Sequence, residues 1–242
     1  MKKKAPAFSL RYNLTGLIAA AILCQLVGCG GVDETQMIAD LKALNVLVSK
    51  DVNGKVNSLN NLPADAENLT KAIDIIAKLE GPRTVTMLDA SQLTAEHLKV
   101  LAGLSDLVQL EFHNAPLDDA AIKPLVGHKK LEALYLINSP ITAAAMEDFG
   151  KIPKLGLLGI SGTKVDGGYE HLHKLEKFEW IIIGGLTIDD EDAKNISEIP
   201  TVTHVTMENT VISPAGLKMI KSNPKCKVDG TSIDPAAAGA SN

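Results

Sequence analysis

Two histidine–glutamate pairs are the first residues of this sequence that suggest metal chemistry. Glu111 and His113 are two positions apart. His204 and Glu208 are four positions apart. Imidazole and carboxylate ligands hold zinc at about 2 Å, but the two pairs fall on strands four spacings apart, or about 19 Å. One shared metal site is therefore excluded, and we expect neither a metal nor a cofactor.

The acidic run Asp189-Asp190-Glu191-Asp192 could suggest a calcium loop. It coincides with the start of an expected helix, where carboxylates favour the positive helix end, so capping is the preferred interpretation. The sequence carries no zinc-peptidase helix, nucleophile elbow, P-loop or cysteine–histidine pairing. We therefore expect no catalytic residues, no enzymatic activity and no small-molecule substrate.

Lipid attachment is a third kind of chemistry, and Cys29 is the candidate residue for it. A basic start (Lys2–Lys4 and Arg11) precedes the apolar stretch 14–23, which has the composition of an export signal and is too short for a membrane span. The following Leu26-Val27-Gly28-Cys29 resembles the lipobox of bacterial lipoproteins. The resemblance implies diacylglyceryl modification of the cysteine.

This resemblance implies a signal peptide over 1–28, a lipidated linker over 29–34 and a location outside the cytoplasm. The chain would be anchored by lipid to a bacterial envelope membrane. We favour the outer membrane or the cell surface over the inner membrane, because Gly30 replaces the aspartate that signals inner-membrane retention in some bacteria. Several acyl chains on one residue give stable anchoring.

Charge and composition narrow the class of partner. Loss of four basic residues with the signal leaves 20 basic and 29 acidic residues, a net charge of −9. An acidic body is a poor nucleic-acid binder, so no nucleic acid is expected. Cys226 is then the one cysteine besides Cys29, so no disulfide framework is expected. The 3% aromatic content favours an aliphatic, repetitive core.

Internal repeats organise the sequence between 83 and 228. Six segments begin at 83, 107, 131, 155, 178 and 202. We number each position by its offset from the first residue of its repeat, counted from zero. Offset five is apolar in every repeat: Leu88, Phe112, Leu136, Ile160, Ile183 and Met207. Offset eleven always carries a helix-capping residue: Thr94, Asp118, Thr142, Asp166, Asp189 and Ser213. Each repeat is therefore expected to be a strand, a turn and a capped helix.

The segment Leu131-Glu132-Ala133-Leu134-Tyr135-Leu136 resembles the Leu-x-x-Leu-x-Leu pattern of leucine-rich repeats. The segment 160–166, with Thr163 after the strand, is similar to repeats of bacterial exported proteins, planctomycete ones especially. The resemblance implies an α/β leucine-rich-repeat solenoid, a short horseshoe with a parallel concave sheet and helices on the convex side. Offset eight lacks the asparagine found in many families, so no buried asparagine ladder is expected.

The two ends depart from the repeat. Residues 35–82 are expected to form an N-terminal cap, since solenoids need atypical ends. Within the cap, a helix over 35–47 and another over 68–79 would enclose a hairpin whose strands pair across a type I′ turn at Asn53-Gly54. Residues 229–242 are expected to form a disordered tail.

Side chains at offsets two, four and six are expected to point out of the concave sheet. In the first repeat these are Val85, Met87 and Asp89. Farther along, they place an apolar group beside an acidic residue and a histidine, and exposed apolar patches with aromatic anchors often mark protein interfaces. The candidate ligand-binding residues are Tyr135, Ile137, Leu157, Trp180, Ile182, Glu111 and His113.

These expectations define a non-catalytic interaction module that binds a protein partner, or alternatively a glycan, through its concave face and a membrane through its lipid. The alternative is a structural or self-assembling envelope component, whose concave patch would mediate contact between copies. An unrecognised enzyme, the third possibility, would need a deep polar pocket with convergent titratable groups.

Overall fold

The computed structural model of the chain describes residues 33–230 and 232–233. The expected signal peptide, Cys29 and most of the linker lie outside this range. Nine strands form one sheet in the order β1-β2-β3-β4-β5-β6-β7-β9-β11, in which β1 and β2 are antiparallel and all later neighbours are parallel. The strand bounds are β1 Leu47–Lys50, β2 Val56–Asn60, β3 Thr84–Met87, β4 Gln109–His113, β5 Ala133–Ile137, β6 Leu157–Gly159, β7 Trp180–Ile182, β9 His204–Thr206 and β11 Lys227–Asp229.

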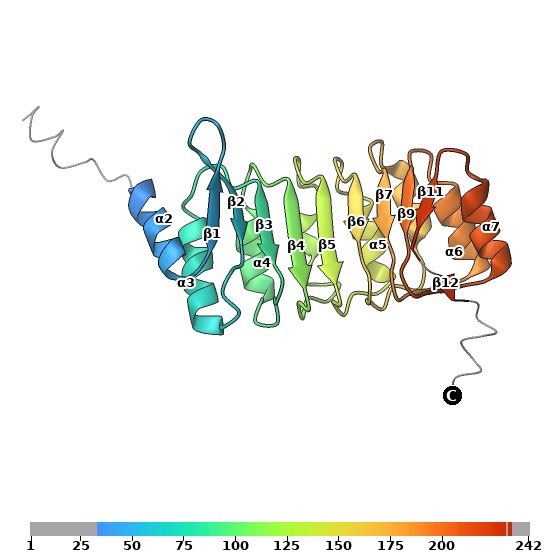
Figure 1. Cartoon of the computed structure of the whole chain (residues 1–242), viewed down its shortest axis with the longest axis horizontal. Coiled ribbons are helices and arrows are strands. Elements are labelled where there is room, and N and C mark those ends of the chain that lie inside the picture. The colour runs from blue at the N-terminus through green and yellow to red at the C-terminus, as the bar shows by residue number, and fades with distance from the viewer. Residues whose placement is uncertain (1–32, 231, 234–242) are drawn as a thin grey trace, which may run out of the picture.

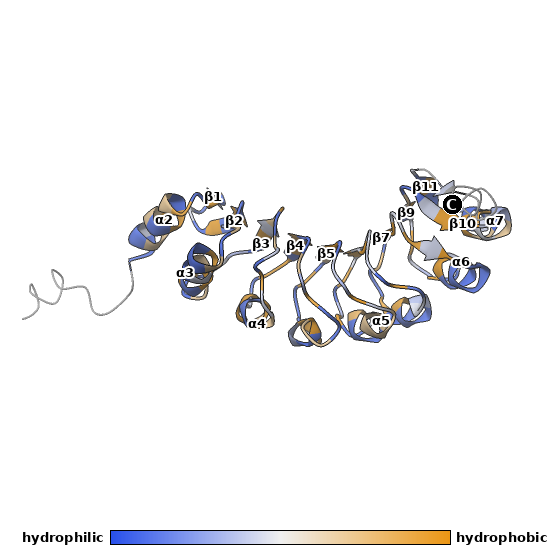
Figure 2. Ribbon diagram, turned by 90° about the horizontal axis from the view of Figure 1, so that it is seen from below, coloured by the Kyte–Doolittle hydropathy of each residue, from blue (hydrophilic) through white to orange (hydrophobic). Residues whose placement is uncertain are grey.

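The helical segments lie on the outer side of the curved array, and the sheet lines its inner side (Figures 1 and 2). Their bounds are α2 Glu34–Ala43, α3 Ala66–Ile76, α4 Ala95–Ala102, α5 Ala144–Phe149, α6 Asp190–Ser197 and α7 Pro214–Ser222, with 3-10 turns η1 Lys123–Leu125 and η2 Tyr169–Lys174. The leucine-rich-repeat solenoid predicted from the sequence is therefore confirmed.

The core is a continuous aliphatic layer between sheet and helices. Phe112, Leu136 and Ile160 at offset five are fully buried, as are Phe149 and Leu98 from the helical side. Burial of one such side chain contributes about 1.5–3 kcal/mol. Because each repeat presents the same apolar positions, the strands stay in register along the array.

A left-handed backbone position follows the strand at offset seven in five of the six repeats. It is occupied by Asn114, Asn138, Gly162, Gly185 and Asn209, with φ between 55° and 72°. Asparagine and glycine are the residues that adopt this conformation at least cost. The backbone N–H of Asn138 donates to the carbonyl of Ser161, and Gly162 donates to Gly184 in the same way. These bonds between neighbouring repeats give backbone groups of the turn hydrogen-bond partners in the absence of an asparagine at offset eight.

Hydroxyl groups at offset eight add to the same turn. Thr163 Oγ1 donates to the Ile160 carbonyl at 2.7 Å, and the buried Thr210 Oγ1 donates to Ile183 at 2.9 Å. The side chain of Asn138 donates to Asn114 Oδ1 at 3.0 Å on the outside of the turn. An exposed asparagine pair and two threonines thus replace the buried asparagine ladder.

The predicted helix caps are confirmed in part. Thr94, Asp118, Asp189 and Ser213 each accept a hydrogen bond from the third backbone N–H that follows. Thr142 Oγ1 accepts from the backbone N–H of Ala144 at 3.3 Å and donates to Asp119 Oδ2 of the previous repeat at 2.6 Å. The prediction for Asp166 is wrong, because η2 begins at Tyr169, directly after Gly168 in left-handed conformation, and has no side-chain cap. Repeats two and four contain 3-10 turns where full helices were expected.

The first repeat is shifted by one residue from the predicted register. Thr84 pairs with Gln109, and Met87 with Phe112. Val85 and Met87, predicted to face outward, are fully buried, whereas Leu88, predicted to face inward, is 64% exposed. Cross-strand pairing with β4 fixes this register, and a one-residue shift moves every side chain to the other face.

The N-terminal cap contains the expected hairpin with a different turn. Only Gly54 of the Asn53-Gly54 pair has positive φ, which excludes type I′. The Asp51 carboxylate instead accepts from the backbone N–H groups of Asn53 and Lys55. A register shift between Ser49 and Lys50 completes this bulged loop.

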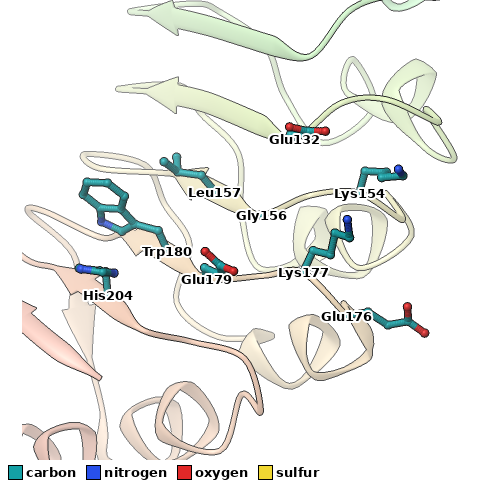
Figure 3. Close-up of a pocket in the computed structure, with 9 residues that line it drawn as sticks. All are labelled: Glu132, Lys154, Gly156, Leu157, Glu176, Lys177, Glu179, Trp180 and His204. Carbon is teal, nitrogen blue, oxygen red and sulfur yellow. The ribbon is translucent and has the colours of Figure 1, made fainter. Parts of the chain in front are cut away.

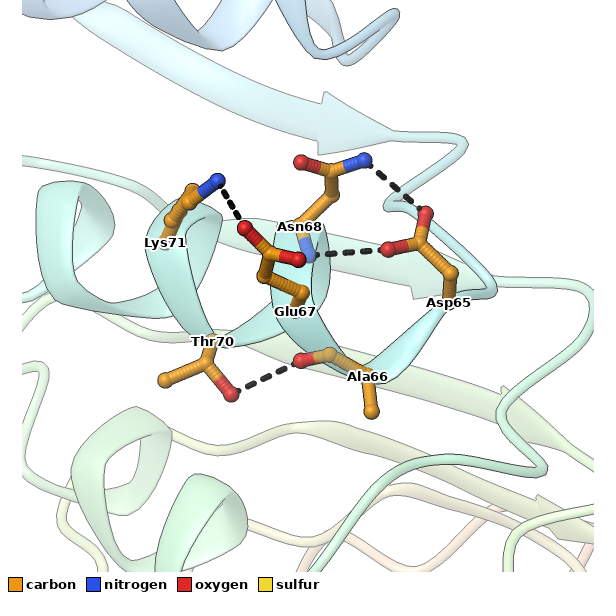
Figure 4. Close-up of polar contacts among 6 residues, drawn as sticks. All are labelled: Asp65, Ala66, Glu67, Asn68, Thr70 and Lys71. Carbon is orange, nitrogen blue, oxygen red and sulfur yellow. Dashed lines mark hydrogen bonds and ion pairs between the residues drawn. The ribbon is translucent and has the colours of Figure 1, made fainter.

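Helix α3 of the cap begins two residues before its predicted start. Asp65 Oδ1 accepts from the backbone N–H of Asn68 at 2.9 Å, and its Oδ2 accepts from the Asn68 side chain (Figure 4). Lys71 and Glu67 form an ion pair one turn apart. The cap at Asp65 therefore sets the beginning of the helix.

A second sheet flanks the last repeats. Strands β8 (Thr187–Ile188), β10 (Thr210–Ile212) and β12 (Ser232–Ile233) are parallel, in the order β12-β10-β8. Asp229, in β11, and β12 fall within the segment predicted as a disordered tail, and pairing with neighbouring strands orders them. Residues 234–242 lie outside the described residues.

Buried polar groups gather between repeats four and five. Tyr169 is fully buried, and its hydroxyl has no hydrogen-bond partner in the described part of the chain. Burial, followed by the negative charge of Asp192, raises the pKa of Tyr169. Burial and then Asp189 raise the pKa of Asp192 to about 6. Burial is thus the first cause of the raised pKa of both groups.

Candidate binding surface

The predicted site residues occupy four adjacent strands of the concave sheet. Glu111 and His113 lie on β4, Tyr135 and Ile137 on β5, Leu157 on β6, and Trp180 and Ile182 on β7. Direct pairs join Glu111 to Tyr135, His113 to Ile137 and Leu157 to Trp180. The structure therefore brings all seven residues onto one continuous surface. We call Tyr135, Ile137, Leu157, Trp180 and Ile182 the concave patch.

Trp180 is the most exposed member of the concave patch, with 38% of its surface accessible. Its indole Nε1 donates to Thr206 Oγ1 of β9 at 2.9 Å. The ring of His204 lies against the indole with centroids 5.4 Å apart and planes inclined by 39°. The indole is thus fixed in orientation, with part of its apolar surface left in solvent.

Tyr135 lies across the neighbouring strand. A Cβ atom on Gly159 would come within 2.7 Å of Tyr135 Cδ1 and 3.5 Å of Ile137 Cδ1. Glycine at this position therefore provides the space in which the tyrosine ring packs. Partial burial, followed by the charge of Glu111, raises the pKa of Tyr135.

The Glu111–His113 pair borders the patch on β4. His113 Nε2 and Glu111 Oε1 are 3.0 Å apart. Both side chains are partly buried, with 25% of Glu111 and 31% of His113 exposed. Across the described ranges, no group of three or more histidine, cysteine, aspartate or glutamate side chains is arranged to hold a metal ion. The pair is a polar margin of the concave patch.

An open groove of about 540 Å³ adjoins the patch where the strands begin (Figure 3). Trp180, Leu157 and His204 form one side of it. The remaining lining comes from the segments that enter the strands, namely Glu132, Lys154, Gly156, Glu176, Lys177 and Glu179. We call this feature the edge groove.

Sequence reasoning missed the edge groove and the residues that hold Trp180. His204 and Thr206 occupy outward offsets two and four, so the repeat register placed them on the surface without indicating their contact with the indole. Glu132 and Glu179 share offset one on either side of Gly156. Their common register position was the signal that could have indicated the groove.

Comparison with protein-family models finds no match. Comparison with curated proteins likewise finds no match. The sequence alone therefore gives no assigned relative.

Solved structures with the same architecture are leucine-rich-repeat proteins of bacteria. An internalin from Listeria monocytogenes is 16% identical, with 76% of this chain and 65% of that chain covered and a TM-score of 0.51. An internalin C2 from the same organism is 18% identical, with 76% and 79% covered and a TM-score of 0.48. A Leptospira interrogans leucine-rich-repeat protein is 17% identical, with 72% and 52% covered and a TM-score of 0.44. At 16% identity, the match to the internalin with a TM-score of 0.51 shows the fold alone, a leucine-rich-repeat solenoid.

Proposed function

We propose that this chain is a non-catalytic interaction module that binds a protein partner through its concave patch. The exposed, oriented indole of Trp180 carries the proposal. Tryptophan and tyrosine contribute a large share of binding energy at protein interfaces when they sit at the centre of a packed patch. Here Leu157 and Ile182 flank the indole, and Tyr135 lies two strands away, or about 10 Å.

Order in the patch favours binding over a merely solvated apolar surface. The Trp180–Thr206 hydrogen bond and the seat of Tyr135 over Gly159 hold both aromatic rings before a partner arrives. A preorganised surface loses less side-chain entropy on association. The concave patch therefore fits a partner with a complementary apolar surface of its own.

The proposed location is a bacterial envelope membrane, through lipid on Cys29. The lipobox-like Leu26-Val27-Gly28-Cys29 and the basic and apolar segments before it support this location. In residues 33–230 and 232–233, no helix has the length and apolarity to cross a membrane. Mass spectrometry of the mature N-terminus tests the anchor: acylated Cys29 is expected, and an unmodified mature N-terminus that begins beyond Cys29 would contradict it.

Partner capture tests the concave patch. Crosslinking pulldowns from native envelopes would compare the unchanged chain with Trp180→Ala and Tyr135→Ala. Met219→Ala is the matched control, because Met219 is a similarly exposed apolar residue on the convex helix α7. Loss of the crosslinked partner in the two patch variants alone supports the proposal. Unchanged capture in both patch variants would overturn the proposal.

The same experiment separates partner binding from self-assembly. If the captured species is a second copy of this chain, light scattering will show a mass that rises with concentration and falls in Trp180→Ala. A monomer at all concentrations together with capture of a different protein supports the interaction module.

A further inference from the structure

The edge groove contains charged side chains that the protein itself does not neutralise. Glu132, Glu179, Lys154 and Lys177 line it, and all four are exposed. Within the described ranges, none of the four lies within ion-pair distance of an opposite charge. Both signs of charge are therefore free to meet groups on a partner.

The position one repeat earlier is different. Lys130 is at the same offset as Lys154 in the preceding repeat, and it forms an ion pair with Asp106 of the repeat before it. The lysine that precedes β5 is thus paired internally, whereas Lys154, which precedes β6, is not. The unpaired charges that line the groove extend from Glu132, before β5, to Glu179, before β7.

Backbone hydrogen bonds fix the positions of Glu132 and Glu179 along the chain segments on either side of Gly156. The Glu132 carbonyl accepts from the N–H of Gly156 at 2.8 Å, and the Gly156 carbonyl accepts from the N–H of Glu179 at 2.8 Å. Glu132 and Glu179 are therefore two strand spacings apart, or about 10 Å. Because the residue between them has no side chain, the floor of the groove lies open there.

Trp180 forms the wall next to these carboxylates. Figure 3 shows Trp180, Glu179 and Lys177 in succession along the groove, with Glu132 on the opposite side. An indole face attracts cations, and arginine in particular stacks on aromatic rings while its planar fork binds carboxylates. The inner part of the groove thus offers an aromatic wall and two carboxylates, and the outer part offers the ammonium groups of Lys154 and Lys177 beside the carboxylate of Glu176.

We propose that the edge groove binds an arginine side chain of the protein partner together with an acidic side chain next to it in the partner. The guanidinium would stack on Trp180 and pair with Glu179, with Glu132 completing the cradle. The acidic group would reach Lys154 and Lys177. This inference rests on the proposed function, whose partner it describes by chemistry.

Tryptophan fluorescence gives a direct test, because Trp180 is the single tryptophan of the sequence. The probe is the peptide acetyl-Ala-Arg-Ala-Glu-Ala-amide, titrated into the full chain. A saturable change in emission is expected. The same peptide with neutral citrulline in place of arginine is expected to bind about three- to ten-fold more weakly, the effect of one lost charge-assisted pair.

Glu179→Gln identifies the carboxylate that meets the guanidinium. This variant is expected to weaken the arginine peptide about three- to ten-fold while leaving the citrulline peptide unchanged. Glu198→Gln is the control, since Glu198 is an exposed carboxylate at the end of α6, away from the groove. No saturable change with the arginine peptide would overturn the inference. Equal binding of both peptides, or equal effects of the two variants, would also overturn it.

Failure of this inference can be told from failure of the proposed function. If Trp180→Ala abolishes partner capture but Glu179→Gln leaves both capture and peptide binding intact, the concave patch binds the partner and the arginine assignment is wrong. If neither variant affects capture, the proposed function itself is wrong.

Discussion

The indole Nε1 of Trp180 donates a 2.9 Å hydrogen bond to Oγ1 of Thr206 on the adjacent strand β9. The bond runs diagonally, because the direct neighbour of Trp180 is His204. It turns the ring toward β9 and leaves its apolar surface beside Leu157 and Ile182. A threonine that lies outside the apolar patch therefore sets the orientation of its main aromatic residue.

Thr206→Val tests this relationship. The substitution keeps the shape and removes the acceptor, and water can replace the bond at the exposed indole, so the free energy of unfolding should fall by less than about 1 kcal/mol. Trp180 emission should shift, its anisotropy should decrease, and partner binding should weaken. Thr187→Val is the control, because Thr187 is an exposed threonine of β8, in the second sheet. Unchanged anisotropy would show that the bond does not orient the ring.

Gly159→Ala should displace Tyr135. The new Cβ would lie 2.7 Å from Tyr135 Cδ1, too close for both to remain in place. We expect a loss of about 1–3 kcal/mol in unfolding free energy, measured in urea, and weaker partner binding. In a Tyr135→Ala background the same substitution should cost much less. An equal cost in both backgrounds would show that the glycine is needed for another reason.

Asp192→Asn should stabilise the protein at neutral pH more than at pH 4. The pKa of Asp192 is raised to about 6 in the folded state, so its ionisation opposes folding: stability falls as pH rises from about 4 to 6 and stays low above that. The gain at pH 7 should be on the order of 1–2 kcal/mol, allowing for partial screening by solvent. Urea unfolding at both pH values measures it, with Glu198→Gln as the control. A gain independent of pH would contradict the assignment.

Tyr169→Phe should leave stability unchanged or raise it by about 1 kcal/mol. The Tyr169 hydroxyl is buried without a hydrogen-bond partner among the described residues, so its removal relieves a desolvation cost and leaves the ring in the core. Thermal unfolding measures the change. Tyr135→Phe serves for comparison at a partly exposed site. A clear loss of stability in Tyr169→Phe would reveal a partner for the hydroxyl.

Substitutions at Gly162 test why the left-handed position at offset seven holds glycine or asparagine. The φ of Gly162 is 66°, and a Cβ there would come within 2.1 Å of Asn138 Oδ1. Gly162→Ala should therefore cost about 1–2 kcal/mol. Gly162→Asn should cost less, because asparagine accepts this conformation and its amide can extend the Asn114–Asn138 pair. Equal losses in urea unfolding would show that backbone conformation does not limit this position.

The solenoid was predictable from the periodicity of the sequence, because the same offset is buried in successive repeats. Leu136 and Ile160 share an offset, and both are fully buried. The register of the first repeat was not predictable from the same pattern. Val85 and Met87 lie on one face of the strand and Leu88 on the other, so both faces carry apolar side chains. Pairing of Thr84 with Gln109 resolves that ambiguity, and such pairing belongs to the folded sheet.

The concave patch was predictable and the edge groove was not. Trp180 and Tyr135 stand at offsets two and four, which face outward in the repeats that keep the predicted register. The groove depends on which charges remain unpaired, and Lys130 and Lys154 occupy the same offset with opposite outcomes. The column at offset seven was readable in the sequence, since it holds asparagine or glycine in five repeats.

The chain enters the solenoid at α2 and β1, and the strand of Trp180 is six strands farther along the sheet. At about 4.8 Å per strand, this separation is about 29 Å. A tether joined at the N-terminal end would make the cap and first repeats a rigid spacer. The spacer would hold a partner at a set height above the membrane surface, and deletion of one whole repeat would lower that height by a single strand spacing.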